Sequence, residues 1–374
     1  MSKPAKKAAI KTDIKQAEKS GKTLPSAQAD ITAKKAQKKI VYVKGLSQDR
    51  VAKVAKMDPY YRNMQLQMPG NNNLEGFGSI QGFKNINICF NGQPCRMEIP
   101  DILVNCMADP DSLEDKLKYL QNIIPRLKQQ NPGLKIINPP EGVLKTRRND
   151  IANLFQGLKA IVVPKAIKIA PKSRRDFIEK IKASGLKMPV IVREAAVHGG
   201  IKLTLIQNFN EEQVEQLDKF ALDGRDHYVT EFVDFKSKDG YYRKARIIMI
   251  GGEVNLRHLI VSEHWNIHGK SREIFVKKHP QLDIPLAREE KKFLQAGKDN
   301  FSKEVQVSLQ QIYKTLGLDI FGMDVGILPG GKLLVFEINA AMEFLALHMK
   351  HAPYIMDQIA VVRSNFIKHV AGEK

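Results

Sequence analysis

The chain has 374 residues and a formal net charge of +20, and 43% of its residues are hydrophobic. This length allows two or three packed units. No apolar run is long enough to span a membrane, and we expect no secretory signal, because no apolar stretch follows the basic N-terminus. Three cysteines, Cys89, Cys95 and Cys106, are too few for a disulfide framework and lack zinc-site spacing. We therefore expect a cytoplasmic protein.

The first 39 residues differ in composition from the rest of the chain. They contain eleven lysines, three acidic residues and no aromatic residue, which gives this segment a net charge of +8. Such a segment buries too little apolar surface to offset the entropy of ordering it, so we expect a disordered tail or a loose helix. Its charge suits an acidic protein, a nucleic acid or a membrane surface, although a solubilising extension explains it equally well.

The next hundred residues predict a small parallel α/β unit. The expected elements, in chain order, are a strand from Ile40, short strands within 85–111, a helix at 112–130 and a strand at 133–140. Ser112 is the expected N-cap of the helix. Strand, helix and strand in this order favour parallel pairing.

The remainder predicts α+β units in which antiparallel strands alternate with helices. The expected elements are a helix at 143–158, a strand at 160–169, a helix at 173–186, two strands within 188–206, a helix from Glu211, a strand at 227–235, an antiparallel pair at 241–262, helices within 287–316, a hairpin at 321–342 and a helix at 350–370.

The hairpin at 321–342 carries three oxygen-bearing side chains in an apolar run. Its strands flank a Pro-Gly-Gly turn at 329–331. If the two glycines form a two-residue turn, Asp324 lies directly opposite Glu337, and Asn339 shares the face of Glu337. Such ligands suit Mg²⁺, which one or two carboxylates hold together with substrate phosphates. A solvated hairpin face is the alternative, but carboxylates in an apolar run need partners.

In their order, these motifs resemble the ATP-grasp superfamily of carboxylate–amine ligases, over about residues 100–345. The likeness is most specific at GMDVGILPGGKLLVFEINAAM, and extends to INPP, VLKTRR, VVP and HLIVSEHWNIH. Within the superfamily the chain resembles the ribosomal-protein glutamate ligase and glutathione synthetase branch, and ATP-grasp domains found beside tetratricopeptide repeats. The resemblance implies that Asp324, Glu337 and Asn339 hold the Mg²⁺ ions (or Mn²⁺) that bridge the phosphates of ATP.

The resemblance also implies a fold in which two α+β subdomains clamp ATP and an N-terminal α/β unit supplies part of the acceptor site. We therefore expect four segments: a tail at 1–39, a substrate-side α/β domain at 40–140, ATP-grasp subdomain A at 141–235, and subdomain B with the metal site at 236–374.

Further residues are assigned to ATP by the same resemblance. Arg193 stands where the family usually has a lysine on the ATP phosphates, and a guanidinium can do that work. The segment YVTEFVDF resembles the hinge that reads adenine, and VHGGIKL resembles the glycine-rich lid whose backbone approaches phosphate. The assigned residues are Glu231, Phe232 and Val233 for adenine, Asp234 for the ribose hydroxyls, and Gly199 and Gly200 for the lid.

Three features depart from the family's pattern. The lid carries His198 and fewer glycines than usual. The family's second phosphate-side lysine falls near Asn149, so Arg147 or Arg148 would have to replace it. Lys244 stands where the glutamate ligases tend to have an acid.

Two other segments contain candidate site residues. Arg246 matches an arginine that the family aims at the reacting phosphate, where a cation stabilises the transferring phosphoryl group; a solvated strand face is the alternative. Residues 257–269 crowd three histidines around Trp265 without the spacing or cysteines of a zinc site. This segment either lines the acceptor pocket between the clamping subdomains or packs Trp265 into the core.

Three polar residues, Asn105, Asp109 and Asp111, follow a strand of the N-terminal unit. Ligand crevices of α/β folds lie at such strand ends, so these residues could hold a substrate amine. Asp-Pro-Asp before a helix is also good turn chemistry, and we favour that role.

We therefore expect an ATP- and Mg-dependent carboxylate–amine ligase that forms an amide or peptide bond on an amino acid, peptide or protein through an acyl phosphate. Arg193 and Arg246 would be its catalytic residues. No arrangement of Ser, His, Asp or Cys suggests a protein nucleophile. Two alternatives remain open: an ATP-grasp kinase acting on a small hydroxyl acceptor, and a binding module that closes on ATP without ligation.

Overall fold

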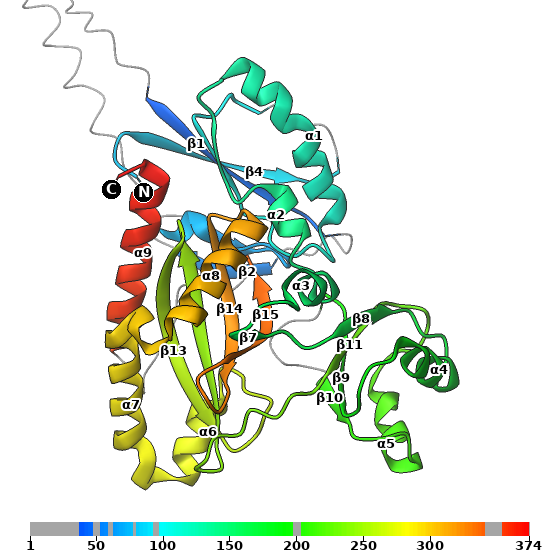
Figure 1. Cartoon of the computed structure of the whole chain (residues 1–374). Helices are drawn as coiled ribbons and strands as arrows, with labels where there is room; N and C mark the ends of the chain where they lie inside the picture. Colours follow the sequence, from blue (N-terminus) through cyan, green and yellow to red (C-terminus); the bar gives the residue numbers. More distant parts are fainter. Residues whose placement is uncertain are drawn as a thin grey trace, which may run out of the picture. The chain divides into compact units, whose positions relative to one another are not determined.

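Figure 1 shows a computed structural model of the chain. It describes residues 37–47, 53–58, 63–77, 80–92, 97–196, 203–340 and 354–373. Residues 38–374 form one compact unit. The expected lid residues Gly199 and Gly200, and nearly all of the tail, lie outside the described residues. No helix in the described ranges is long and apolar enough to cross a membrane.

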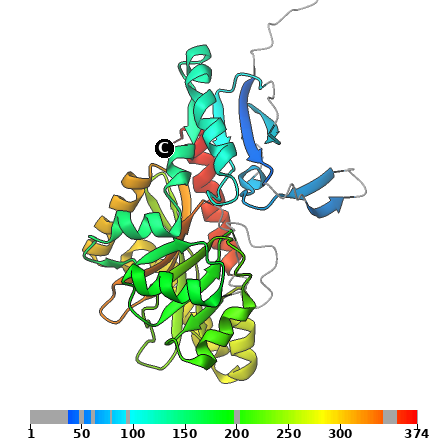
Figure 2. The ribbon, with the colours of Figure 1, turned by 90° about the vertical axis from the view of Figure 1, so that its right-hand side faces the viewer.

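The N-terminal unit is built on a four-stranded parallel sheet in the order β4-β1-β5-β6. Its elements are β1 (Lys38–Gly45), β4 (Phe83–Phe90), β5 (Ile102–Asn105), α1 (Glu114–Gln130) and β6 (Lys135–Ile137). The segment Ile102–Asn105 is buried throughout, as parallel strands covered on both faces are. A separate hairpin of β2 (Lys53–Asp58) and β3 (Asn63–Gln67) projects away from this sheet in Figure 2.

The turn before α1 is held by Asp109 rather than by Ser112. The helix begins at Glu114, and its N-cap residue has no side-chain cap bond. Asp109 Oδ1 instead accepts from the backbone N–H of Asp111 at 3.1 Å, and its Oδ2 accepts from Ser112 Oγ at 2.6 Å. The predicted cap at Ser112 is therefore wrong, because the hydroxyl is used one turn earlier.

A second sheet is antiparallel, in the order β10-β9-β11-β8. Its elements are β8 (Ala166–Ile169), α4 (Arg174–Ser184), β9 (Val190–Glu194), β10 (Leu203–Ile206), α5 (Glu211–Glu215) and β11 (His227–Glu231). Helix α4 starts where Ser173 accepts from the N–H of Asp176 and ends at Gly185, whose φ of 66° is left-handed. Its buried Phe177 and Ile181 pack on the sheet through Val190 and Val192.

The third sheet has five strands in the order β13-β12-β14-β15-β7. Its elements are β7 (Ile161–Val162), β12 (Tyr242–Ile250), β13 (Glu253–Ser262), β14 (Ile320–Ile327) and β15 (Leu333–Asn339), with the helices α6 (Ser271–Lys278), α7 (Asp283–Ala296), α8 (Lys303–Leu316) and α9 (Ile355–Ala371). β7 pairs in parallel with β15, so a strand from the segment 141–235 completes this sheet. The expected fold class, a parallel α/β unit followed by two α+β units, is confirmed.

The helix expected at 143–158 is broken. The chain forms α2 (Pro140–Leu144) and α3 (Arg148–Phe155) instead. Thr146 Oγ1 donates to the carbonyl of Val143 at 2.7 Å, and Arg147 is extended, with ψ of 143°. The break matters for the site, because it gives the two adjacent arginines different surroundings.

Candidate active site

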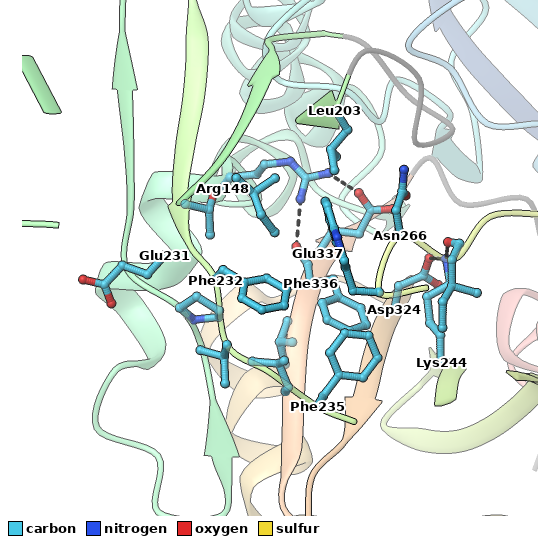
Figure 3. A pocket seen from close by; sticks show the side chains of 18 of the residues that line it. Arg148, Leu203, Glu231, Phe232, Phe235, Lys244, Asn266, Asp324, Phe336 and Glu337 are labelled. Carbon is cyan, nitrogen blue, oxygen red and sulfur yellow. Dashed lines mark hydrogen bonds and ion pairs between the residues drawn. The ribbon is translucent and has the colours of Figure 1, made fainter. Parts of the chain in front are cut away.

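A pocket lies between the sheet of β8–β11 and the sheet of β12–β15, and Figure 3 shows it from close by. Its apolar wall includes Ile191, Leu203, Phe232, Trp265, Leu334 and Phe336. Its charged end is made by Arg148, Arg193, Lys244, Asp324 and Glu337. A pocket with one apolar end and one strongly charged end suits a ligand that joins a flat apolar group to an ionic group.

The hairpin of β14 and β15 brings the two carboxylates together. Asp324 pairs with Glu337, as the sequence predicts. The connection differs, however, from the expected two-residue turn. Ile327 pairs with Leu333, and the Leu328 N–H donates to the carbonyl of Lys332 at 2.9 Å, which leaves a three-residue loop at 329–331. A β-bulge at Phe336 restores the register before Glu337. Both glycines of the loop have positive φ, 85° and 80°, which other residues rarely adopt.

Asp324 is buried and is held by two cations from the neighbouring strand β12. Its Oδ1 accepts from Arg246 Nε at 2.7 Å, while its Oδ2 accepts from Arg246 Nη2 and Lys244 Nζ, each at 3.1 Å. Burial alone would raise the pKa of Asp324, but the charges of Arg246 and Lys244 outweigh it and hold the pKa well below its ordinary value. Asp324 is therefore ionised at neutral pH.

Glu337 is paired across the pocket by Arg148, from the first turn of α3. Arg148 Nη2 binds Glu337 Oε2, and its Nη1 donates to the carbonyl of Phe336 at 2.8 Å (Figure 3). Burial would raise the pKa of Glu337, but Arg148 and Arg193 lower it below its ordinary value. Asn339 lies two residues further along β15 and lines a smaller cavity with Glu337 and Arg148.

Arg147 has a different environment from its neighbour. Its Nη2 binds Glu114 at 2.8 Å and donates to the carbonyl of Pro110 at 3.1 Å, and its Nε lies 3.7 Å from Asp111. These partners all belong to the N-terminal unit. Of the two candidate replacements for the family's lysine, Arg148 lines the pocket between the two sheets, while Arg147 is bound to Glu114 and Pro110 of the N-terminal unit.

Arg193 projects from β9 into the same charged end. Its pKa is lowered to about 10, because the side chain is buried and because the positive charge of Arg148 is close. The group stays protonated at neutral pH. Two neighbouring guanidinium groups repel each other, so a polyanionic ligand placed between them would relieve that repulsion.

The expected adenine hinge lies along the apolar wall. Glu231, Phe232 and Val233 all line the pocket. The Glu231 side chain points away from it in Figure 3, and its Oε1 accepts from the N–H of Lys187 at 2.9 Å. The Phe232 N–H donates to the carbonyl of Pro189 at 2.9 Å. Only the backbone of Glu231 can therefore serve a ligand in this conformation.

Asp234, assigned to the ribose, is exposed and does not line the pocket. Its Oδ1 accepts from the backbone N–H of Lys236 at 3.2 Å. Trp265 does line the pocket, and its ring contacts Phe232 edge-on with ring centroids 5.6 Å apart. The segment around Trp265 therefore faces the apolar end of the pocket. From the sequence we expected it either to line the acceptor pocket or to pack Trp265 into the core.

The histidines of that segment do not form a cluster. A β-bulge at Arg257 sets both Arg257 and His258 opposite Arg246, and the Arg257 guanidinium lies 2.8 Å from His258 Nδ1. Burial, together with the charges of Arg246 and Arg257, lowers the pKa of His258 well below its ordinary value. His264 is exposed. A buried neutral imidazole beside two arginines gives no metal site.

The polar residues of the N-terminal unit have structural partners. Asn105 is buried, donates to the carbonyl of Asn138 at 3.0 Å, and accepts from the N–H of Met107 at 3.0 Å. Asp111 accepts from the hydroxyl of Tyr228 at 2.9 Å and from Lys168 at 3.2 Å. These contacts tie the end of β5 to the sheet of β8–β11.

The donor set fits Mg²⁺ that arrives with phosphates better than a metal held by protein alone. Within the ranges that the structure describes, no three His, Cys, Asp or Glu side chains are grouped as a metal site. Asp324, Glu337 and Asn339 offer two carboxylates and an amide oxygen, which are the hard oxygen donors that Mg²⁺ takes. Phosphate oxygens would have to complete the coordination.

Comparisons with known proteins agree with the motifs. No family model matches the sequence. Over 123 residues the chain is 29% identical to a coenzyme gamma-F420-2:alpha-L-glutamate ligase from Methanocaldococcus jannaschii, which covers 33% of this chain and 40% of that protein. The chain therefore spans less than half of that curated relative.

Two solved structures are similar over most of the chain. One is a RimK domain protein ATP-grasp from Sphaerobacter thermophilus, with 10% identity and a TM-score of 0.49 over 89% of this chain and 100% of that one. The other is the VanG D-Ala:D-Ser ligase from Enterococcus faecalis, with 14% identity and a TM-score of 0.49 over 90% of this chain and 99% of that one. The chain is therefore similar in sequence to a glutamate ligase over a third of its length, and the solved structures that it resembles include an ATP-grasp protein and a D-Ala:D-Ser ligase.

Proposed function

We propose that the protein is an ATP-dependent carboxylate–amine ligase and that the pocket between the two α+β sheets binds ATP. The observation that carries the proposal is the charged end of the pocket. There Arg148, Arg193 and Lys244 surround two ionised carboxylates, next to an apolar slot. This pattern fits a triphosphate at one end and an adenine ring at the other.

The residues divide into an adenine side and a phosphate side. The backbone from Glu231 to Val233 and the rings of Phe232, Trp265 and Phe336 would hold the base. Arg148 and Arg193 would bind phosphate oxygens, and Arg246 would stabilise charge on the γ-phosphate as it is transferred. Gly199 and Gly200 stay predicted lid residues, and Asp234 a predicted ribose contact.

The reaction needs no protein nucleophile. A carboxylate oxygen of the first substrate forms a bond to the γ-phosphorus, and the bond to the leaving ADP oxygen breaks. The nitrogen of an amine then bonds to the carbonyl carbon of the acyl phosphate, inorganic phosphate leaves, and the nitrogen loses a proton. Water must be kept from the acyl phosphate, so closure of the subdomains is part of the mechanism.

Mg²⁺, or Mn²⁺ in its place, would be held by Glu337 and Asn339 with the phosphates. When bound, the ion supplies positive charge to the phosphate oxygens. Around it, Arg148 holds Glu337 in position through a charge-assisted hydrogen bond. Asp324 fits a metal only if Lys244 and Arg246 release it.

The substrates would be an amino acid, a peptide or a protein tail. The division into segments 1–39, 40–140, 141–235 and 236–374 stays a proposal, as does an acidic partner for the basic segment. Cys106 is a buried free thiol, which suits the reducing, cytoplasmic setting that we propose.

A screen of ADP release with amino acids and short peptides tests the proposal, with hydroxylamine present to trap an escaping acyl phosphate as a hydroxamate. We expect ADP release that depends on a carboxylate substrate, a hydroxamate in the trap, and an amide product by mass spectrometry. A phosphorylated hydroxyl acceptor without hydroxamate would make the protein a kinase. ATP binding without turnover of any acceptor would make it a binding module.

A further inference from the structure

The carboxylate of Asp324 accepts three hydrogen bonds from cations of the protein itself. Both of its oxygens accept from Arg246, at 2.7 and 3.1 Å, and Oδ2 also accepts from Lys244 at 3.1 Å. The residue is only 4% exposed. A divalent ion at Asp324 would have to share the carboxylate with these two cations and would be repelled by them.

The two cations are fixed by the sheet. Arg246 pairs directly with Asp324, and Lys244 pairs with Gly326, so both lie on the strand adjacent to the carboxylate. Lys244 Nζ also donates to the carbonyl of Ile267 at 2.7 Å. Moving either cation away would leave a buried charge without its partner, which is costly.

Glu337 differs from Asp324 in each of these respects. Its side chain is 23% exposed in the pocket, and its partner Arg148 binds through Oε2. No hydrogen bond to Oε1 is formed by the residues that the structure describes. Arg148 comes from α3 and is tied to β15 through the Phe336 carbonyl at 2.8 Å, and it binds only Oε2 of Glu337. An ion can therefore reach Glu337 without breaking the sheet.

The balance of charge points the same way. Four cationic side chains act on the two carboxylates, Arg246 and Lys244 on Asp324, and Arg148 and Arg193 on Glu337. These four cationic and two anionic side chains together carry an excess of two positive charges. ATP with one divalent ion keeps a net negative charge that this excess neutralises, whereas ATP with two such ions is close to neutral and would leave the cations uncompensated.

We infer that the site takes ATP with a single divalent ion, held by Glu337 and Asn339, and that Lys244 and Arg246 occupy Asp324 in place of a second ion. This inference rests on the proposed ATP site and departs from the ligand set implied by the family resemblance. Asp324 is then a positioning residue, which fixes Lys244 and Arg246 where they meet the phosphates.

Equilibrium dialysis with Mn²⁺ and a non-hydrolysable ATP analogue tests the inference by counting both ligands on the same sample. We expect one Mn²⁺ per bound analogue in the wild-type protein. A ratio of two would overturn the inference while leaving the proposed function intact. A wild-type protein that binds no analogue would contradict the proposed function itself.

Two matched variants locate the ion. Glu337→Gln should reduce the gain in analogue affinity caused by Mn²⁺ by about tenfold or more, since it removes a ligand charge. Asp324→Asn, whose folding is checked by circular dichroism, should keep that gain close to the wild-type value, because the ion has no ligand at Asp324. The exposed Glu212→Gln serves as the control. A loss in Asp324→Asn as large as that in Glu337→Gln would place the ion on Asp324 and overturn the inference.

Discussion

Glu337 keeps its negative charge in a partly buried position because two arginines lie beside it. Burial by itself would favour the protonated carboxyl group, but Arg148 and Arg193 lower the pKa of Glu337. The ionised form is what a divalent cation needs. Removing the charge while keeping the shape of the side chain therefore separates the chemistry of this residue from its packing.

Glu337→Gln should reduce ADP formation with every substrate by about a hundredfold or more, because both the ion and Arg148 lose their anionic partner. ADP release under saturating Mg²⁺ measures this effect, with the exposed Glu212→Gln as the control. Near wild-type turnover in Glu337→Gln would remove Glu337 from the site.

His227 lies far along the chain from the two carboxylates. Burial lowers the pKa of a histidine, whereas it raises the pKa of a carboxyl group. The His227 side chain is buried between the ring of Phe220 and the backbone of Arg225. Its Nε2 is buried without a hydrogen-bond partner in the described part of the chain. Burial lowers the pKa of His227 below its ordinary value.

The pH dependence of stability follows from that shift. The unfolded chain takes up a proton at His227 as the pH falls below about 6.5, and the folded protein resists it, so the free energy of unfolding decreases towards lower pH. The loss is at most about 1.4 kcal/mol per pH unit for this group. Urea unfolding at pH 7.5 and 5.5 should show a smaller difference for His227→Gln than for wild type. Equal differences would show that His227 is protonated as easily in the fold as outside it.

At the scale of elements, the break between α2 and α3 decides which arginine serves the pocket. Arg147 is extended and its side chain binds Glu114 of the N-terminal unit, while Arg148 is the first residue of a new helix. From there Arg148 reaches β15 and connects α3 with the strand that carries Glu337. This contact links the two sides of the pocket.

Arg148→Met should raise the KM for ATP by about tenfold or more, because it removes a charge-assisted contact on the phosphate side. Arg175→Met, on the exposed surface of α4, is the matched control and should leave KM unchanged. Steady-state kinetics over a range of ATP concentrations measures both. An unchanged KM in Arg148→Met would show that ATP does not use this arginine.

The sequence predicted the elements around the site better than their connections. The opposition of Asp324 and Glu337 was correct, since apolar alternation and a Pro-Gly-Gly turn restrict the hairpin strongly. The three-residue loop and the bulge at Phe336 were not predictable from the sequence. The longer loop shifts the pairing by one residue and the bulge shifts it back, so Asp324 still pairs with Glu337. Lys244 and Arg246 are two residues apart on one strand, so their side chains lie on the same face. This spacing could have predicted that both cations reach Asp324.

At the scale of the whole molecule, the units between 38 and 374 share buried structure. Residues of α9 such as Val362 and Phe366 pack in one buried cluster with Tyr42 of β1 and Ile248 of β12. Asn138, after β6, exchanges hydrogen bonds with the backbone of Ile320 at 2.7 and 2.8 Å. Such long-range contacts depend on the packed fold and have no local sequence signature.

The basic segment before β1 should be dispensable for catalysis on a small acceptor, since it contains no aromatic residue and few apolar residues that could dock on a core. A chain that begins at Lys38 should turn over ATP with a small acceptor within about threefold of the full chain. Side-by-side ADP-release assays measure this. A shortened chain that binds ATP but turns over no acceptor of the full chain would place the segment in the active site.

The central claim is that a carboxylate is activated by transfer of the γ-phosphate, and the path of its oxygen tests this most directly. A carboxylate substrate labelled with a heavy oxygen isotope gives up one labelled oxygen when the amine displaces phosphate from the acyl phosphate. Mass spectrometry of the released phosphate should therefore find one labelled oxygen for each amide formed. Unlabelled phosphate beside a full yield of amide would contradict the acyl-phosphate mechanism and the proposed function with it.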